Sequence, residues 1–365
     1  MEIQQLQDIY GRHPMIRRLG KALARADVRS IRLSGLQGSA APLFFASFAL
    51  RCPQQLGAPY LFVMNDEAEA AYFYQDMVPL LGDEQVLYFP SSFKRAVKYG
   101  QRDSANVVLR TEVLSRLSGG ALPLFVITSP QALSEQVIDS SSLQGHTLEL
   151  SVGDARDIMD VQQSLLDMGF LRVDYVYEPG QFALRGSLLD VYSYSSELPY
   201  RIDFFGDEVD SIRTFDVQDQ LSVKKLQHVS IIPDSSAQAD VSVQSFLSFL
   251  PEDTLFIARD TIYICDCVQK IWTDGFSAQA LLVQESEGQY EEIPKGTPQD
   301  SPAQGQVLLD RDTLLTPPHL FSSQLQQFRM LMLTSSDVQK ADVVLEAHTL
   351  PQPIFHKNFD LLFQA

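Results

Sequence analysis

Short apolar runs that alternate with helix-length segments constrain the fold of this 365-residue chain more than any other feature. The clearest runs are Tyr60–Met64, Val86–Phe89 and Leu124–Thr128, and Ser30–Leu33 is a shorter example. Strands that are apolar along their whole length are buried on both faces, which is typical of a parallel sheet covered by helices on both sides. The sequence therefore predicts an α/β fold with a mostly parallel sheet.

Helix-starting residues stand between these runs. Asn65-Asp66 can cap a helix over Glu67–Leu81, Asp103 precedes a segment with one apolar face, and Ser129-Pro130 supplies an N-cap with proline at the first helical position. A further helix is expected over Ala41–Cys52. The same alternation returns after a linker at Asp234–Gln238. The later elements expected are strands over Thr254–Ala258, Arg329–Thr334 and Val343–Ala347, a helix over Thr261–Trp272 and a long exposed loop over Glu285–Gln306.

The pattern changes near Ser151 and becomes rich in strands. An amphipathic helix is expected over Asp154–Met168, and Gly206-Asp207 is expected to form a hairpin turn. The strands predicted after the helix are Leu171–Tyr177, Gln181–Leu184, Leu188–Tyr194, Tyr200–Phe205 and Val209–Phe215. The predicted organisation is an α/β domain, residues 1–150 and 234–365, interrupted by a small, β-rich α+β domain over residues 151–233.

The charge of the chain argues against broad nucleic-acid binding. The formal net charge is -18 and the pI is about 4.7. Residues 151–220 hold fourteen Asp and Glu, five Arg and no Lys. Arginine is enriched at protein interfaces because its planar fork pairs bidentately with carboxylates, so this segment is predicted to present a protein-docking surface.

Composition also narrows the cellular setting. Three cysteines, Cys52, Cys265 and Cys267, make a disulfide framework implausible. No apolar run approaches the roughly 18 residues of a membrane span, and the N-terminus lacks a secretory signal pattern. We expect a soluble cytoplasmic protein. The Cys265-Asp266-Cys267 spacing has no supporting histidine cluster, so neither a metal nor a cofactor is expected.

The turn Gly35–Pro42 follows a strand and precedes a helix, which is where a phosphate-binding loop would lie. The template G-x-x-x-x-G-K-[ST] requires glycine, lysine and a hydroxyl where this chain has Ala40, Ala41 and Pro42. The lysine for the β- and γ-phosphates is absent, and Pro42 lacks a backbone N–H. We interpret the turn as a degenerate phosphate loop, comprising Gly35, Gly38, Ser39 and Ala41, that leads into a helix.

A basic cluster provides an alternative function. Lys94, Arg95, Lys98 and Arg102 lie close together with aromatic neighbours, which is a pattern that can contact nucleic acid. The segment Lys94–Arg102 is short, and a solvated loop before a helix explains it more simply. DNA binding through this patch therefore stays as the alternative hypothesis.

The insert contains the most specific sequence motifs of the chain. It reads GFLRVDYV from Gly169, EPGQFALRGSLLDVY from Glu178 and LPYRIDFFGDEVDSIRTFD from Leu198. This text resembles the family of bacterial transcription-repair coupling factors (Mfd) and, more distantly, the excision-repair protein UvrB. Both share the RG strand, the following strand with a double phenylalanine, and the FD ending.

The resemblance implies the N-terminal UvrB-like module of a longer protein, split into domain 1a (1–150), an inserted domain 2 (151–233) and domain 1b (234–365). Its larger domain would be a degenerate relative of the P-loop NTPase fold. In this family, domain 2 is understood to bind UvrA and so to recruit it to stalled RNA polymerase in nucleotide excision repair. The full-length family member is an ATP-dependent translocase that binds RNA polymerase and double-stranded DNA. Its motor lies outside this chain, so we expect no ATPase activity and no cofactor here.

The position of the family motif selects the candidate UvrA-binding residues. Arg185 lies in the RG strand, and Arg201 and Asp203 share one face of the next strand because side chains alternate along a strand. Arg172 and Arg213 are secondary candidates. An alternative stays open for each arginine, namely a salt bridge with one of the nearby acids. The aromatic ring of Phe204 is expected in the core.

Overall fold

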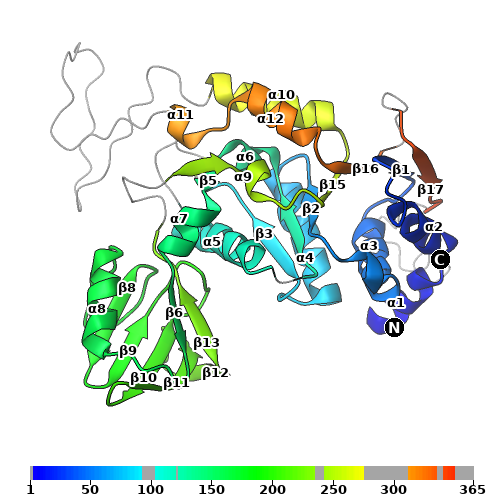
Figure 1. Cartoon of the computed structure of the whole chain (residues 1–365). Helices are drawn as coiled ribbons and strands as arrows, with labels where there is room; N and C mark the ends of the chain where they lie inside the picture. The colour runs from blue at the N-terminus through cyan, green and yellow to red at the C-terminus, as the bar shows by residue number, and fades with distance from the viewer. Residues whose placement is uncertain are drawn as a thin grey trace, which may run out of the picture.

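Two sheets organise the chain in the computed structural model. The structure describes residues 3–92, 103–120, 122–234, 242–274, 311–334 and 340–349. The larger sheet has seven strands, all paired in parallel, in the order β17-β1-β16-β15-β2-β4-β3 (Figure 1). Its strands are β1 (Ser30–Ser34), β2 (Tyr60–Val63), β3 (Val86–Phe89), β4 (Phe125–Thr128), β15 (Leu255–Ala258), β16 (Arg329–Met332) and β17 (Val343–Glu346).

Helices cover both faces of the seven-stranded sheet, so the expected α/β class is confirmed. One apolar core lies under α2 (Pro14–Leu23), α3 (Ala40–Arg51) and α4 (Glu67–Leu81), and α1 (Ile3–Gly11) packs on α3. The opposite core lies under six of the described helices. These are α5 (Ser104–Ser118), α6 (Pro130–Ser134), α7 (Ser140–Gly145), α9 (Phe246–Phe249), α10 (Thr261–Asp274) and α12 (Pro318–Leu325).

Local sequence explains where these elements begin. The carboxylate of Asp66 accepts a hydrogen bond from the backbone N–H of Glu69 at 2.8 Å and caps α4, as predicted. Asp103 and Ser129 cap α5 and α6 in the same way. Every residue of β2, β4 and β15 is buried, as expected for strands with a helix layer on each side.

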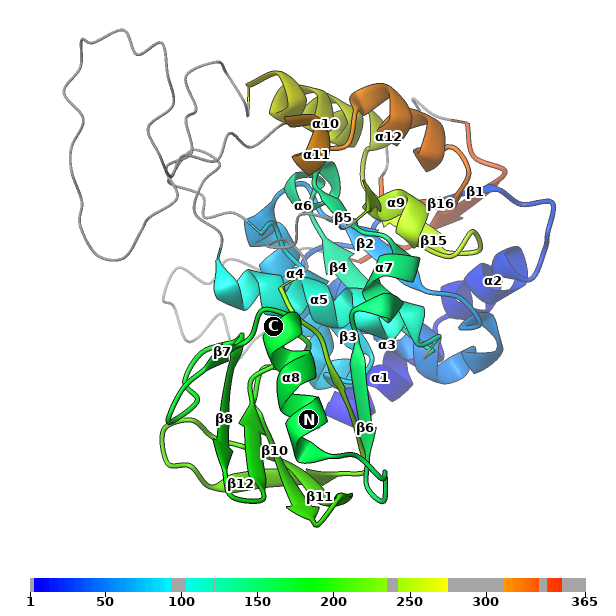
Figure 2. The same ribbon diagram turned by 60° about the vertical axis from the view of Figure 1, so that its left-hand side comes forward.

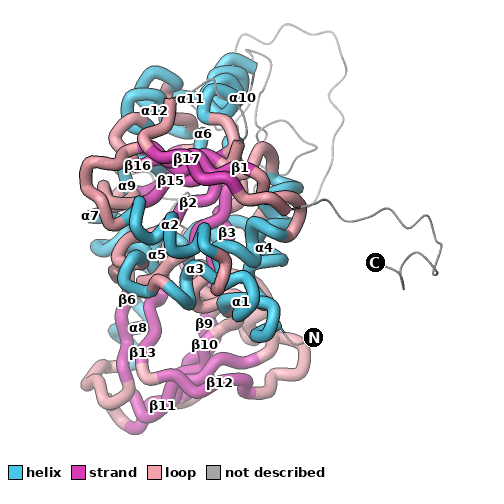
Figure 3. Tube along the Cα trace, turned by 90° about the vertical axis from the view of Figure 1, so that its right-hand side faces the viewer, coloured by secondary structure: helices cyan, strands magenta, loops and turns pink. Residues whose placement is uncertain are grey.

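A second, six-stranded sheet forms the insert, in the order β12-β11-β10-β9-β8-β7. Helix α8 (Ile158–Asp167) packs on one face of this sheet (Figure 2). The strands are β7 (Leu171–Arg172), β8 (Gln181–Arg185), β9 (Leu188–Val191), β10 (Tyr200–Phe205), β11 (Glu208–Phe215) and β12 (Ser222–Leu226). An antiparallel pair, β6 (Leu148–Ser151) and β13 (His228–Ile231), carries the chain into and out of the insert. Figure 3 shows this unit at one end of the larger one.

Several predicted boundaries in the insert are wrong. The helix expected from Asp154 begins at Ile158, because the carbonyl of Asp154 bonds the N–H of Val209 and Asp157 provides the cap. The strand expected over Leu171–Tyr177 ends at Arg172, since residues 173–178 form a loop across the sheet. The strand from Leu188 ends at Val191 rather than Tyr194.

Five of the described strands were not predicted from the sequence, namely β5 (Gln136–Ile138), β6, β12, β13 and β14 (Val243–Ser245). β12 is a polar edge strand whose first four residues are all exposed, so it has no apolar alternation to detect. By contrast, the Gly206-Asp207 turn is confirmed between β10 and β11, where Gly206 adopts a φ of +63°.

Some of the remaining sequence predictions can be compared with the structure, and others concern residues outside the described ranges. The larger sheet draws strands from both ends of the sequence, which supports the predicted interruption of one domain by the insert. The domain limits at 150 and 233 stay predictions. The basic segment Lys94–Arg102 and the loop Glu285–Gln306 lie outside the described residues. In the described ranges, no helical segment combines the length and apolar character that a bilayer crossing requires.

Candidate protein-docking face of the insert

Polar side chains gather on the face of the six-stranded sheet that is turned away from α8, here called the outer face. Strand register places Arg201 opposite Asp190 on one side and Arg213 on the other. Asp203 lies opposite Leu188, which in turn faces Arg185. Because directly paired residues point to the same side of a sheet, the structure brings Arg185, Arg201, Asp203 and Arg213 together, although they come from three strands.

Asp190 is the centre of this face and was not selected from the sequence. Its residue is only 1% exposed, and its carboxylate accepts hydrogen bonds from two arginines. Arg201 donates from Nε at 2.7 Å and from a terminal nitrogen at 2.9 Å. Arg185 donates a third hydrogen bond from one of its terminal nitrogens. The alternative left open in the sequence analysis, an ion pair within the domain, therefore holds for both arginines.

Arg201 is fixed from every side. Its other terminal nitrogen donates to the backbone carbonyl of Gln220 at 3.0 Å, and its guanidinium lies 4.2 Å from the ring centroid of Phe215. Gln220 holds this position with a φ of +62°. The side chain of Arg201 is only 11% exposed. Arg201 is consequently a positioning residue that builds the outer face.

Arg185 is more accessible than Arg201. Its side chain is 35% exposed, and its guanidinium lies 5.0 Å from the ring centroid of Tyr175. Tyr175 belongs to the loop 173–178, which is anchored on the outer face by the buried side chain of Val176 beside Ala183. Arg185 therefore presents its free edge in a fixed orientation, since Asp190 and Tyr175 hold its two sides.

The other predicted residues differ in how firmly they are held. Asp203 accepts one hydrogen bond, from the hydroxyl of Ser187 at 3.2 Å. Arg213 donates to the hydroxyl of Ser211 at 3.1 Å, and its guanidinium has no carboxylate partner in the part of the chain that the structure describes. Arg172 is exposed, but it lies in the short edge strand β7 and pairs with the core residue Phe182, so it is not brought into the outer face.

An exposed aromatic ring lies beside these charges. Phe205 ends β10 and is 83% exposed, whereas its neighbour Phe204 is 4% exposed and lies in the core, as predicted. The side chains of β10 alternate along its whole length, so Phe204 points into the core and Phe205 points to the same side as Arg201 and Asp203. The sequence analysis did not select Phe205, although the alternation that it used for Arg201, Asp203 and Phe204 also places Phe205 on the outer face.

Tyrosines on this sheet add no charge. Burial raises the pKa of Tyr200, and burial followed by the carboxylate of Glu197 raises the pKa of Tyr192. The phenol of Tyr192 donates to the backbone carbonyl of Glu197 at 2.6 Å. The electrostatic character of the outer face therefore comes from its arginines and carboxylates.

The degenerate phosphate loop is occupied by the protein itself. The N–H of Gln37, which would face a phosphate, donates instead to the hydroxyl of Thr349 at 3.0 Å. The same hydroxyl donates to the carbonyl of Gly35 at 2.6 Å. Gly35 has a φ of +81°, and a Cβ there would lie 1.5 Å from the carbonyl oxygen of Ala347. Among the other loop residues, Gly38 also has a positive φ, Ser39 donates to Asp76 and Ala41 lines the adjoining crevice. A phosphate-binding geometry is not confirmed.

Comparison with known proteins gives the insert a family assignment. Residues 148–236 match the family model described as the UvrB interaction domain. The chain is also similar to proteins named transcription-repair-coupling factor. The matches are 29% identity over 202 residues with that of Bacillus subtilis, 35% over 147 residues with that of Escherichia coli and 31% over 209 residues with that of Myxococcus xanthus.

These matches cover 55%, 40% and 56% of this chain, and 17%, 13% and 17% of the three relatives. The chain thus spans less than a fifth of the length of the relatives it matches. The resemblance drawn from the motif text is confirmed. The insert is a UvrB-like interaction module of the kind found in proteins of transcription-coupled DNA repair.

Proposed function

We propose that this chain is a recruitment module that binds UvrA through the outer face of its insert. The observation that carries the proposal is the combination of one exposed aromatic ring with fixed charges on a single sheet face. Phe205 is 83% exposed and ends β10, the strand that also carries Asp203, while Arg185 lies on β8 of the same sheet, across β9 from Asp203. A few aromatic and arginine side chains usually carry most of the binding energy of a protein interface.

The family match supports the choice of UvrA as the proposed partner. The matched range 148–236 contains every residue of the outer face. A UvrB interaction domain on a relative of transcription-repair-coupling factors would bring UvrA to RNA polymerase stalled on damaged double-stranded DNA in the cytoplasm. RNA polymerase and DNA would be partners of the longer protein, outside this chain.

The mechanism is recruitment without chemistry in this chain. Asp190 and Arg201 hold the sheet face rigid, so the partner does not have to order it on binding. Arg185, Asp203 and Arg213 then provide donors and an acceptor for charged groups on UvrA, and Phe205 provides the apolar anchor. The absence of ATPase activity remains a prediction, supported by the loss of the phosphate-loop lysine and by the hydrogen bond from Gln37 to Thr349.

Calorimetric titration against purified UvrA tests the proposal. The test variant is Phe205→Ser, which removes an exposed ring and leaves the Asp190 network intact. We expect its loss of affinity to be about 30-fold, which corresponds to about 2 kcal/mol for a central interface aromatic.

The matched control is Met159→Ser. Met159 lies on α8, on the opposite side of the same sheet, and is 56% exposed. It therefore loses a comparable apolar side chain from a surface that the proposal leaves free. Equal affinities for the wild type and both variants, or no binding by any of the three, would contradict docking through the outer face.

A further inference from the structure

A crevice in the larger domain has no place in the proposed recruitment. It lies at the carboxyl ends of the parallel strands, where β2 leads into α4 on one face and β15 leads into α10 on the other. Open parallel sheets bind ligands where neighbouring connections leave in opposite directions. The crevice has a volume of about 910 Å³, which is large enough for several side chains.

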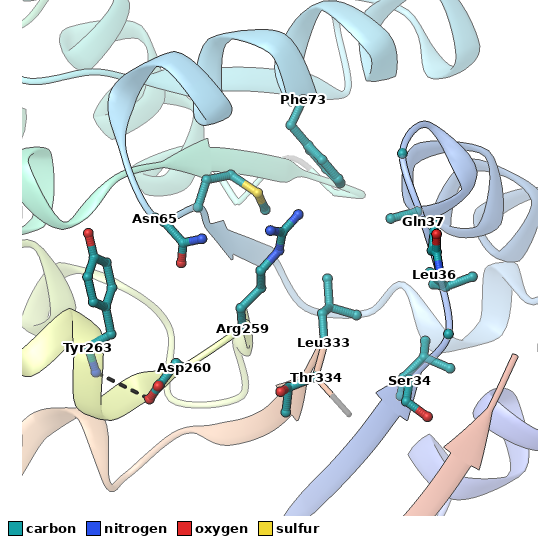
Figure 4. Close-up of a pocket in the computed structure, with 15 residues that line it drawn as sticks. Ser34, Leu36, Gln37, Asn65, Phe73, Arg259, Asp260, Tyr263, Leu333 and Thr334 are labelled. Carbon is teal, nitrogen blue, oxygen red and sulfur yellow. Dashed lines mark hydrogen bonds between the residues drawn. The ribbon is translucent and has the colours of Figure 1, made fainter. Parts of the chain in front are cut away.

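The lining of the crevice combines apolar side chains with uncharged polar ones and carries no net charge, which suits an occupant that is itself apolar or neutral. Figure 4 shows Leu36, Phe73 and Leu333 around it, with Arg259 extending into its centre. Arg259 is neutralised by Glu69, whose carboxylate lies 2.6 Å from the guanidinium. Among the described residues that line the crevice, Asp260 is the only other charged group, so a phosphate or another anion would meet no net positive charge there.

The path of the chain after β17 suggests which segment could occupy the crevice. After β17, the chain crosses the rim of the crevice and is tied there, because Thr349 bonds both Gly35 and Gln37. The next residues, 350–365, lie outside the described residues and read LPQPIFHKNFDLLFQA. This text contains three phenylalanines, and six residues of extended chain reach up to about 20 Å from Thr349.

We propose that the crevice is the docking site for residues 350–365, with Phe355 as the first aromatic anchor. The ring would enter the apolar pocket between Leu36 and Leu333, with the guanidinium of Arg259 available to its face. Tethering at Thr349 makes the contact intramolecular, which raises the effective concentration to the millimolar range and lets a modest apolar contact saturate. The degenerate phosphate loop then serves as an anchoring point for the chain's own polypeptide.

Tryptophan fluorescence of the full chain tests this proposal. The native tryptophan is removed by Trp272→Phe, and Phe355→Trp places a single reporter in the segment. We expect blue-shifted emission and protection from acrylamide. Leu36→Asn, or independently Leu333→Asn, would make the crevice polar, shift the emission to the red and increase quenching severalfold. Leu50→Asn, at an exposed position on α3, should leave both signals unchanged.

Two results would overturn the proposal. One is a reporter that is quenched as strongly in the unaltered crevice as in both asparagine variants, each shown by circular dichroism to be folded. The other is protection that disappears on dilution, since that would place the segment on a second copy of the chain. Neither result depends on UvrA, so the proposal can fail while the recruitment function stands.

Discussion

Asp190 offers the sharpest test of how the outer face is built. The substitution Asp190→Asn keeps the size of the side chain but removes the charge that two arginines share. Asp190 is 1% exposed, and the side chain of Arg201 is 11% exposed. The amide nitrogen of asparagine would face an arginine donor, so at least one N–H of a largely buried guanidinium loses its acceptor.

The expected cost follows from the burial of the network. Removing one partner of a buried ion pair costs about 3 to 5 kcal/mol, and we expect the lower end because Arg185 keeps access to water. For a unit of fewer than 100 residues that unfolds independently, this cost lowers the melting temperature by more than about 10 °C. Thermal unfolding followed by circular dichroism, on the full chain, measures it.

The control for this prediction is Asp203→Asn on the same sheet face. Asp203 accepts a single 3.2 Å hydrogen bond from Ser187 and is half-buried, so its loss should cost no more than about 1 kcal/mol. If the two variants unfold at the same temperature, the two arginines are not held by Asp190 in the way that the distances imply.

Further predictions concern the larger domain and Arg213 of the insert. Gly35→Ala should prevent stable folding or cost several times more than Gly38→Ala in urea denaturation, because the new Cβ at 35 would meet the carbonyl of Ala347, whereas that at 38 has nothing within 4 Å; similar midpoints would contradict this. Calorimetric titration with MgATP should give no saturable heat, and Mg²⁺-dependent binding would show that the loop still accepts phosphate. Burial raises the pKa of Glu112, so its ionised form opposes folding: Glu112→Gln should stabilise the chain at pH 7, and the gain should shrink as the pH falls towards 4.5, whereas a gain that grows in acid would reverse the sign. Arg213→Glu should leave the melting temperature unchanged and weaken UvrA binding about tenfold, and unchanged affinity would remove Arg213 from the docking face.

The sequence predicts the parallel sheet well because each signal is local. A continuous apolar run as short as Tyr60–Met64 favours a buried strand over a helix, and Asp66, Asp103 and Ser129 each cap the helix that follows them. These preferences agree with the burial that the fold imposes, so no long-range information is needed.

Strands in the insert are harder to predict because their boundaries depend on neighbours. The segment from Leu171 is apolar enough to continue as a strand, but it leaves the sheet after Arg172 so that Val176 can bury itself beside Ala183 and Phe215. Likewise, β12 is a strand only because β11 offers it an edge. Strand boundaries that depend on tertiary contacts in this way produce no periodic pattern in the sequence.

The roles of the site residues are likewise only partly predictable from the sequence. The motif text places Arg185 and Arg201 equally well on a polar strand face, yet the structure gives them different roles. Arg201 is enclosed by Asp190, Gln220 and Phe215, whereas Arg185 keeps about a third of its side chain in solvent. Sequence position alone cannot make this distinction. The burial of Arg201 depends on Phe215, which lies on β11, and on Gln220 in the turn that follows β11.

This division determines which substitutions can report on docking. Reversing the charge of Arg201 would place a second carboxylate beside the buried Asp190, and like charges at that depth disfavour the fold itself. Loss of UvrA binding in such a variant would follow from an unfolded sheet as readily as from a lost contact. Within the part of the chain that the structure describes, Phe205 and Arg213 depend on no buried partner, so their substitution changes the surface and leaves the framework in place. A docking face that rests on a buried ion pair is therefore best tested at its rim and its exposed anchor, with the central pair kept intact.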